Sequence, residues 1–287
     1  MKRKIAVLTA ALLLISTGFA SALSLESLFE PTGKAAVIQL SGGIAPTSSG
    51  FSSGITPEKV RDLNDMARQR NVDAVVYEIN SGGGAVVASK EVMRSIESMD
   101  VPTVCRLRDT GASGAYLASL GCDEIVADSA TLTGSIGVRS SYLQYTGLMD
   151  KLGLKYVNIT AGENKELGSP YQNISEEEKQ RLKQKAETIH AEFVQKVGEE
   201  RNLTDAELEN VSTGEAILGS RAKELGLVDE IGGRQTAYDV AENLTGTELN
   251  FNKVETAQSF SLFSLFGASM ENGFFSSSSS SFESKVG

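Results

Sequence analysis

The residues of this sequence that could perform chemistry lie in two glycine-rich turns. Residues 79–84 (Ile-Asn-Ser-Gly-Gly-Gly) and residues 109–115, which surround Ser113 with small side chains, each follow an apolar run and precede a helical pattern. Glycine lets a backbone approach a ligand closely, and amides at a helix start favour negative charge. One turn therefore offers donors for an oxyanion and the other a hydroxyl nucleophile, although a plain tight turn is the alternative for each. The first turn does not have the spacing of a nucleotide-binding loop, and the second lacks the Gly-x-Ser-x-Gly spacing of a nucleophile elbow.

A serine nucleophile needs a general base, and the sequence has one histidine, His190. It lies one position beyond the apolar stripe of its helix, among charged and amide side chains, so we expect a solvated surface residue. A Ser-His-Asp or Cys-His site would have to use this residue, and a His-rich zinc enzyme is excluded. Without this histidine, the main candidate for the base is a lysine, which can serve if burial lowers its pKa so that the neutral amine is populated.

The elements that must position these turns alternate between strands and helices. Short apolar runs predict strands at residues 35–40, 73–79, 101–107, 125–127 and 156–159. Amphipathic patterns predict helices over residues 56–70, 85–99 and 175–197, and two or three short helices up to about residue 244. This alternation predicts an α/β fold with a mainly parallel sheet flanked by helices. Open α/β sheets place their sites at the carboxyl ends of the strands, where both glycine-rich turns begin.

The chain divides into three segments by composition. Residues 1–23 contain a basic start, an apolar run and an Ala-x-Ala end, which predict a signal peptide or an N-terminal membrane anchor. Because positive flanks stay in the cytoplasm, we expect the remainder to lie outside it, anchored to the cell membrane or secreted after cleavage. Residues 30–250 form the predicted catalytic domain, and residues 256–287 form a Phe/Ser-rich, low-complexity tail that we expect to be flexible.

Charge and cysteine content limit the partners. The 287 residues carry a net charge of −10, which argues against nucleic acid as a partner. Cys105 and Cys122 could pair in an oxidising compartment, but both lie in apolar, strand-like surroundings. We therefore expect two buried free thiols.

Five motifs together resemble a known family. Residues 79–84, 112–116, 133–138, 165–170 and 222–229 are similar, in this order, to motifs of the signal peptide peptidase A (protease IV) family. The resemblance covers residues 34–244 and is closest to the short, one-unit members. It implies a crotonase/Clp-protease-like fold of repeated ββα units and a membrane-anchored serine protease. The family usually has proline at the position of Gly82, so this loop is expected to be less rigid while keeping its amides.

The resemblance also implies roles for particular residues. Ser113 would be the nucleophile, Lys165 the general base, Ser135 the residue that orients the lysine amine, and the backbone amides of Gly84 and Gly114 the oxyanion hole. No cofactor and no metal are implied. The expected substrates are apolar peptides such as remnant signal peptides, and the expected assembly is a homo-oligomeric ring with neighbour-completed sites. The alternatives are a crotonase-like enzyme acting on acyl-coenzyme A and a non-catalytic, membrane-anchored scaffold of the same fold.

Overall fold

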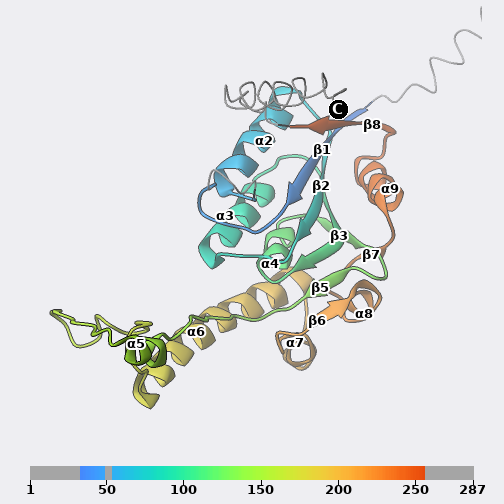
Figure 1. Ribbon diagram of the computed structural model, residues 1–287. Coiled ribbons are helices and arrows are strands. Elements are labelled where there is room, and N and C mark those ends of the chain that lie inside the picture. Colours follow the sequence, from blue (N-terminus) through green and yellow to red (C-terminus); the bar gives the residue numbers. More distant parts are fainter. Residues whose placement is uncertain (1–32, 49–53, 256–287) are drawn as a thin grey trace, which may run out of the picture. The chain divides into compact units, whose positions relative to one another are not determined.

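The computed structural model describes residues 33–48 and 54–255 of the chain (Figure 1). In chain order its elements are β1 (Gly33–Ser41), α2 (Pro57–Gln69), β2 (Ala74–Ser81), α3 (Val86–Glu97), β3 (Thr103–Ala112), α4 (Gly114–Ser119), β4 (Glu124–Ala127), β5 (Leu132–Gly134), α5 (Thr146–Leu152), α6 (Glu176–Arg201), α7 (Asp205–Val211), β6 (Ala216–Leu218), α8 (Gly219–Glu224), β7 (Glu230–Ile231), α9 (Arg234–Thr245) and β8 (Leu249–Val254).

The strands form one sheet in the order β6-β5-β3-β2-β1-β8, and β4 pairs with both β3 and β7. Every pairing is parallel except that of β5 with β6. The first half of β3 pairs with β4 and its last three residues pair with β5. The predicted α/β class with a mainly parallel sheet is confirmed. The parallel register brings the carboxyl ends of β2 and β3 side by side, at Ser81 and Gly111.

Helices cover both faces of the sheet (Figure 1). On one face α2, α3, α4 and α6 contribute to the larger apolar core, with Leu63, Ile96 and Val197 among its buried members. On the other face α9 packs Ala237 and Ala241 against the sheet. Both faces of the central strands are therefore buried, which explains why these strands read as nearly continuous apolar runs.

The helix starts follow the local sequence. The hydroxyl of Thr56 accepts a hydrogen bond from the Lys59 amide (3.2 Å), with proline at the first position of α2. Ser175 and Glu178 form the predicted capping box at the start of α6. Each side chain satisfies an amide that has no partner within its helix, so both starts could be predicted from sequence.

One predicted strand is wrong. Residues 156–159 lie in an irregular segment between α5 and α6, where Ile159 is 94 % exposed. A short apolar run becomes a strand only when a neighbouring strand pairs with it, and these residues have no such neighbour within the described chain.

The sequence did not predict β8, which pairs in parallel with β1. Leu249 and Val254 are its only buried residues, so its sequence pattern is weak.

The expectation of free thiols is also wrong, because Cys105 and Cys122 form a disulfide with a Cα–Cα distance of 5.7 Å. Cys105 lies in β3, and Cys122 follows α4 where the chain turns back towards β4. The pairing of β3 with β4 brings the two cysteines together. Apolar surroundings alone could not distinguish a buried thiol from a buried disulfide.

The predictions for residues 1–23 and 256–287 fall outside the described residues. Within residues 33–48 and 54–255, no helix is both long enough and apolar enough to cross a bilayer.

A buried carboxylate joins α9 to the sheet. Glu78 is fully buried in β2, and its oxygens accept hydrogen bonds from Arg106 Nη1 (3.0 Å), Arg234 Nε (2.7 Å) and Gln39 Nε2 (3.0 Å). Burial by itself raises the pKa of Glu78, but the hydrogen bonds from Arg234 and Gln39 and the two guanidinium charges lower it below its ordinary value. Because Arg234 is the first residue of α9, this ion pair fixes the start of that helix.

We predict that Glu78→Ala lowers the free energy of unfolding by about 3–5 kcal/mol, because it leaves the mostly buried Arg106 without its carboxylate. The exposed Glu91→Ala should change it by less than about 0.5 kcal/mol. A carboxylate with a lowered folded-state pKa stabilises the protein at neutral pH and loses that effect as the pH falls through this pKa. Urea unfolding should therefore show that the difference in the free energy of unfolding between wild type and Glu78→Ala is smaller at acidic than at neutral pH. A difference that stays constant would contradict this assignment.

Candidate active site

Ser113 lies at the junction of β3 and α4 in a backbone conformation that L-residues rarely adopt. Its φ is +54° and its ψ is −124°. Its amide donates a hydrogen bond to the Gly134 carbonyl at the end of β5 (2.8 Å). A non-glycine residue with positive φ is strained and persists only where its surroundings enforce it. The sharp strand-to-helix turn projects a half-buried Ser113 from the carboxyl edge of the sheet.

The glycines of the first turn pack directly against this serine turn. A Cβ on Gly83 would lie 2.5 Å from the Gly114 nitrogen, and a Cβ on Gly114 would lie 3.1 Å from the Gly84 nitrogen. Gly83 also has a φ of +91°. The structure thus brings the predicted donors Gly84 and Gly114 together beside Ser113, at a separation that requires residues without side chains.

Hydrogen bonds to Ile44 orient the Gly84 amide. The Ile44 amide donates to the Gly83 carbonyl, and the Ala85 amide donates to the Ile44 carbonyl (2.9 Å each). In such a parallel bridge the amide of the intervening residue, here Gly84, faces away from Ile44. The amide pair of Gly84 and Gly114 can therefore bind an oxyanion in front of Ser113.

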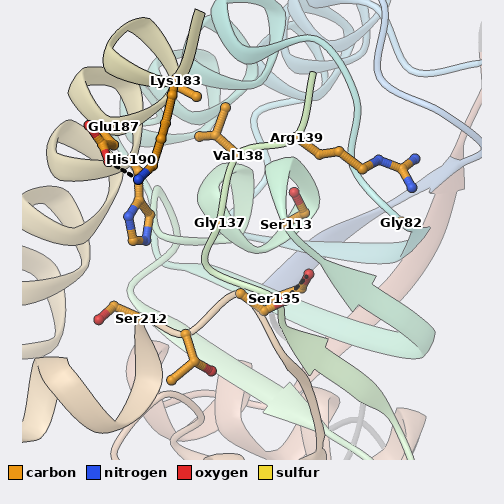
Figure 2. A pocket seen from close by; sticks show the side chains of 13 residues that line it. Gly82, Ser113, Ser135, Gly137, Val138, Arg139, Lys183, Glu187, His190 and Ser212 are labelled. Carbon is orange, nitrogen blue, oxygen red and sulfur yellow. Dashed lines mark hydrogen bonds and ion pairs between the residues drawn. The ribbon is translucent and has the colours of Figure 1, made fainter. Parts of the chain in front are cut away.

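Ser135 lies directly after β5. It also has a positive φ, of +50°, and its hydroxyl donates to the Gly214 carbonyl (3.1 Å). Ser113 and Ser135 line a common cavity of about 640 Å³, which continues between α6 and residues 212–214. Figure 2 shows both hydroxyls at this cavity, across from side chains of α6. The structure therefore brings Ser113 and Ser135 to one site.

Lys165 is not part of this site within one chain. It is exposed in a turn of the segment between β5 and α6, and it is not among the residues that line the cavity. We call residues 140–172 the arm. Figure 1 shows α5, which belongs to the arm, beside the N-terminal part of α6 and away from the sheet.

Two lysines that sequence reasoning did not single out lie closer. Lys183 of α6 lines the cavity and pairs with Glu187 (Nζ to Oε1, 3.4 Å), and Lys90 of α3 lines an adjacent cleft and pairs with Glu192. No sequence motif marks either residue. Both ammonium groups already bind carboxylates, whereas a general base needs a free, neutral amine.

The expectation that His190 is solvated is wrong. It is half-buried, lines the cavity, and its Nε2 lies 3.2 Å from the Ile136 carbonyl oxygen. Because a carbonyl can only accept, Nε2 must carry the proton in this contact. The helical pattern placed His190 beside the apolar stripe, but it could not show that the chain following β5 packs against that side. His190 therefore supports the cavity wall.

A cleft of about 350 Å³, lined by apolar side chains and by Lys90 and Arg139, adjoins the amide pair. It borders Ser113, Gly84 and Gly114, and its apolar lining consists of Val86, Leu117, Val138, Ile189 and Phe193. Sequence periodicity marked Ile189 and Phe193 of α6 only as members of an apolar stripe.

In residues 33–48 and 54–255, no three His, Cys, Asp or Glu side chains cluster as metal ligands would.

Comparison with known proteins agrees with this architecture. Residues 96–248 match peptidase family S49. A putative protease of Methanocaldococcus jannaschii is 36 % identical over 67 % of this chain and 64 % of its own length. A putative signal peptide peptidase SppA of Enterococcus faecium is 31 % identical over 75 % of this chain and 65 % of its own length. The chain thus spans slightly less than two thirds of either relative.

A solved structure shares the fold at low sequence identity. The 1510-N membrane-bound stomatin-specific protease, as a lysine-to-alanine mutant in complex with a substrate peptide, superposes with a TM-score of 0.53. The match covers 82 % of this chain and 98 % of that one at 13 % identity. At this identity the likeness establishes the fold alone.

We predict that Gly83→Ala slows fluorophosphonate labelling of Ser113 by about 10²–10³-fold, because the added Cβ crowds the Gly114 amide and strains a positive φ. Gly82→Ala is the matched control, since a Cβ there meets nothing within 4 Å. The rate should be measured for both variants at equal folded fraction. Equal labelling of Gly83→Ala and wild type would show that this amide pair is not an oxyanion site.

Proposed function

The chain belongs to peptidase family S49, and we propose that it is a membrane-associated serine endopeptidase that cleaves apolar peptides with a Ser-Lys dyad. The observation that carries this proposal is the strained Ser113 turn packed against the amides of Gly84 and Gly114. A nucleophile beside two preorganised backbone donors suits the tetrahedral intermediate of acyl transfer.

In the proposed reaction the neutral amine of Lys165 removes the Ser113 hydroxyl proton as Oγ attacks the peptide carbonyl carbon. The electron pair of the carbonyl moves to oxygen, which the amides of Gly84 and Gly114 bind. The lysine ammonium then protonates the leaving nitrogen as the carbon–nitrogen bond breaks. Water then attacks the carbonyl carbon of the resulting ester while the amine takes its proton. The bond between this carbon and Oγ breaks, the lysine ammonium returns the proton to Oγ, and the carboxylic acid product leaves.

We assign Lys165 to the Ser113 site of a neighbouring copy of the chain. Within one chain Lys165 is exposed on the arm, and the two lysines near the Ser113 site already bind carboxylates. The cavity that Ser113 and Ser135 line has space for an incoming amine, and in this proposal the Ser135 hydroxyl orients it. Burial in that cavity would favour the neutral form of an amine, as a general base requires.

The surface of the arm supports association with a second copy. Its exposed large apolar side chains are Tyr142, Leu143, Tyr145, Leu148, Leu152, Leu154, Tyr156, Val157, Ile159 and Tyr171. So many exposed apolar side chains in one segment are typical of an interface. A head-to-tail contact that places the arm of one chain on the body of the next forms a ring when the rotation between neighbouring chains closes.

The apolar side chains of the cleft beside Ser113 support the substrate class. Its aliphatic and aromatic lining suits a hydrophobic peptide side chain next to the scissile bond. The names of two similar proteins, a putative signal peptide peptidase and a membrane-bound stomatin-specific protease, give signal peptides and stomatin as the substrates of those proteins. For this chain we propose remnant signal peptides and related membrane segments.

We place the catalytic domain outside the cytoplasm, attached to the membrane through residues 1–23. The basic start and apolar run of that segment support this orientation. The Cys105–Cys122 disulfide agrees with it, because disulfides persist in oxidising compartments.

We predict that Ser113→Ala lowers kcat for an apolar peptide with the sequence of a signal peptide by about 10⁴-fold or more, since it removes the nucleophile. Ser220→Ala is the matched control, an exposed serine of α8. Unfolding curves should show that both variants remain folded. Undiminished cleavage by Ser113→Ala would overturn the assignment.

A complementation experiment tests the shared site. Ser113→Ala and Lys165→Ala chains, each inactive alone, should regain about one quarter of wild-type activity when coexpressed in equal amounts, because one quarter of head-to-tail contacts then join an intact serine to an intact lysine. Coexpressing Ser113→Ala with the Ser113→Ala/Lys165→Ala chain should restore nothing. If the first mixture stays inactive although mixed oligomers form, Lys165 does not act across chains.

A further inference from the structure

The Cys105–Cys122 disulfide closes a loop that contains the Ser113 turn. The two cysteines are 17 positions apart, and Ser113 lies near the midpoint between them. Cys105 is a fully buried residue of β3, the strand that enters the turn. Cys122 follows α4, the helix that leaves it. The bond therefore joins the two elements whose relative position sets the geometry of the turn.

This turn needs external constraint. The backbone of Ser113 is strained, and α4 has only six residues, too few to be stable as an isolated helix. The start of α4 also lacks a hydrogen bond from a capping side chain. The conformation therefore depends on contacts with the surrounding structure.

Noncovalent contacts hold both ends of the turn. At the nucleophile end, the Ser113 amide donates to Gly134, and the buried Tyr116 hydroxyl donates to the Leu227 carbonyl (2.9 Å). Beyond the far end of α4, next to the disulfide, the Asp123 carboxylate accepts hydrogen bonds from the Thr103 amide (2.7 Å) and hydroxyl (2.9 Å). The Asp123 amide in turn donates to the Thr103 hydroxyl and carbonyl oxygens (3.1 Å each). The disulfide adds to these hydrogen bonds a covalent link between β3 and the residues that follow α4.

We propose that Cys105 and Cys122 are positioning residues whose disulfide keeps Ser113 aligned with the amides of Gly84 and Gly114. This inference rests on the proposed peptidase function. It makes the rate of the chemical step depend on the oxidised state of a bond that contacts neither substrate nor reacting atoms. Reduction by dithiothreitol transfers two electrons and two protons to the disulfide, giving two protein thiols and the cyclic disulfide of the reagent.

The first test compares the full-length Cys105→Ala/Cys122→Ala variant with wild type on an apolar peptide. We expect kcat to fall by about tenfold or more while KM stays within about twofold, because misalignment affects the reacting atoms more than peptide binding. Phe251→Ala is the control for general destabilisation, since it removes the stacking of Phe251 on Tyr238 (ring centroids 3.8 Å) on the face of the sheet covered by α9. All proteins should be assayed at a temperature where they are folded.

Reduction of the disulfide with dithiothreitol is the second test. It should lower the kcat of wild type to that of the double cysteine variant and leave the variant itself unchanged. The proposal is overturned if the double variant or reduced wild type keeps the wild-type kcat. It is also overturned if Phe251→Ala with an equal loss in Tm shows an equal loss in kcat.

Hydrogen exchange separates this inference from the peptidase assignment. The Leu117 amide donates to the Ser113 carbonyl (2.9 Å) and reports directly on the turn. We expect its exchange to be at least about tenfold faster in the double cysteine variant and unchanged in Phe251→Ala. Wild-type protein that cleaves no peptide would refute the proposed function. Unchanged exchange at Leu117 would refute the positioning role, whether or not the protein cleaves peptides.

Discussion

The strained backbone of Ser113 is the constraint on which the site depends. A serine with positive φ can persist at the end of β3 because the neighbouring chain enforces it. The carbonyl at the end of β5 accepts its amide hydrogen bond, and glycines at positions 83 and 114 allow two turns to approach within contact distance. The parallel register of β2, β3 and β5 therefore places the Ser113 hydroxyl and the amides of Gly84 and Gly114 at one edge of the sheet, in addition to forming the buried core.

The groups assigned to catalysis are divided between two parts of the chain. The body of the fold holds Ser113, Ser135 and the amide pair, whereas Lys165 lies on the arm among exposed apolar side chains. In the proposed assembly, docking of the arm on a neighbouring chain accounts both for its exposed apolar surface and for the separation of Lys165 from the serine of its own chain. Covering the arm removes its apolar surface from water, and inserting Lys165 into the neighbouring cavity desolvates its amine, which favours the neutral form. Association and activation would then share one interface.

Three sequence expectations failed for a common reason. Residues 156–159 have the composition of a strand, His190 follows a solvated helical pattern, and the two cysteines resemble buried thiols. In the structure the apolar run is exposed, the histidine contacts the Ile136 carbonyl, and the cysteines are bonded. Each outcome depends on which distant segment packs against the residue. Local periodicity and composition carry no information about that partner.

The sequence by itself determined the features that depend on neighbouring residues along the chain. Apolar runs and helical periods specified the central strands and helices, Thr56 and Ser175 specified two helix starts, and the glycine-rich turns marked the edge where the site lies. Tertiary structure decided which of these features meet. Parallel pairing of the strands placed Gly84 beside Gly114 and brought together the two cysteines that flank Ser113 in sequence. The position of the arm keeps Lys165 away from the serine of its own chain. Contacts between residues far apart in sequence are set by strand register and packing, which a local pattern does not encode.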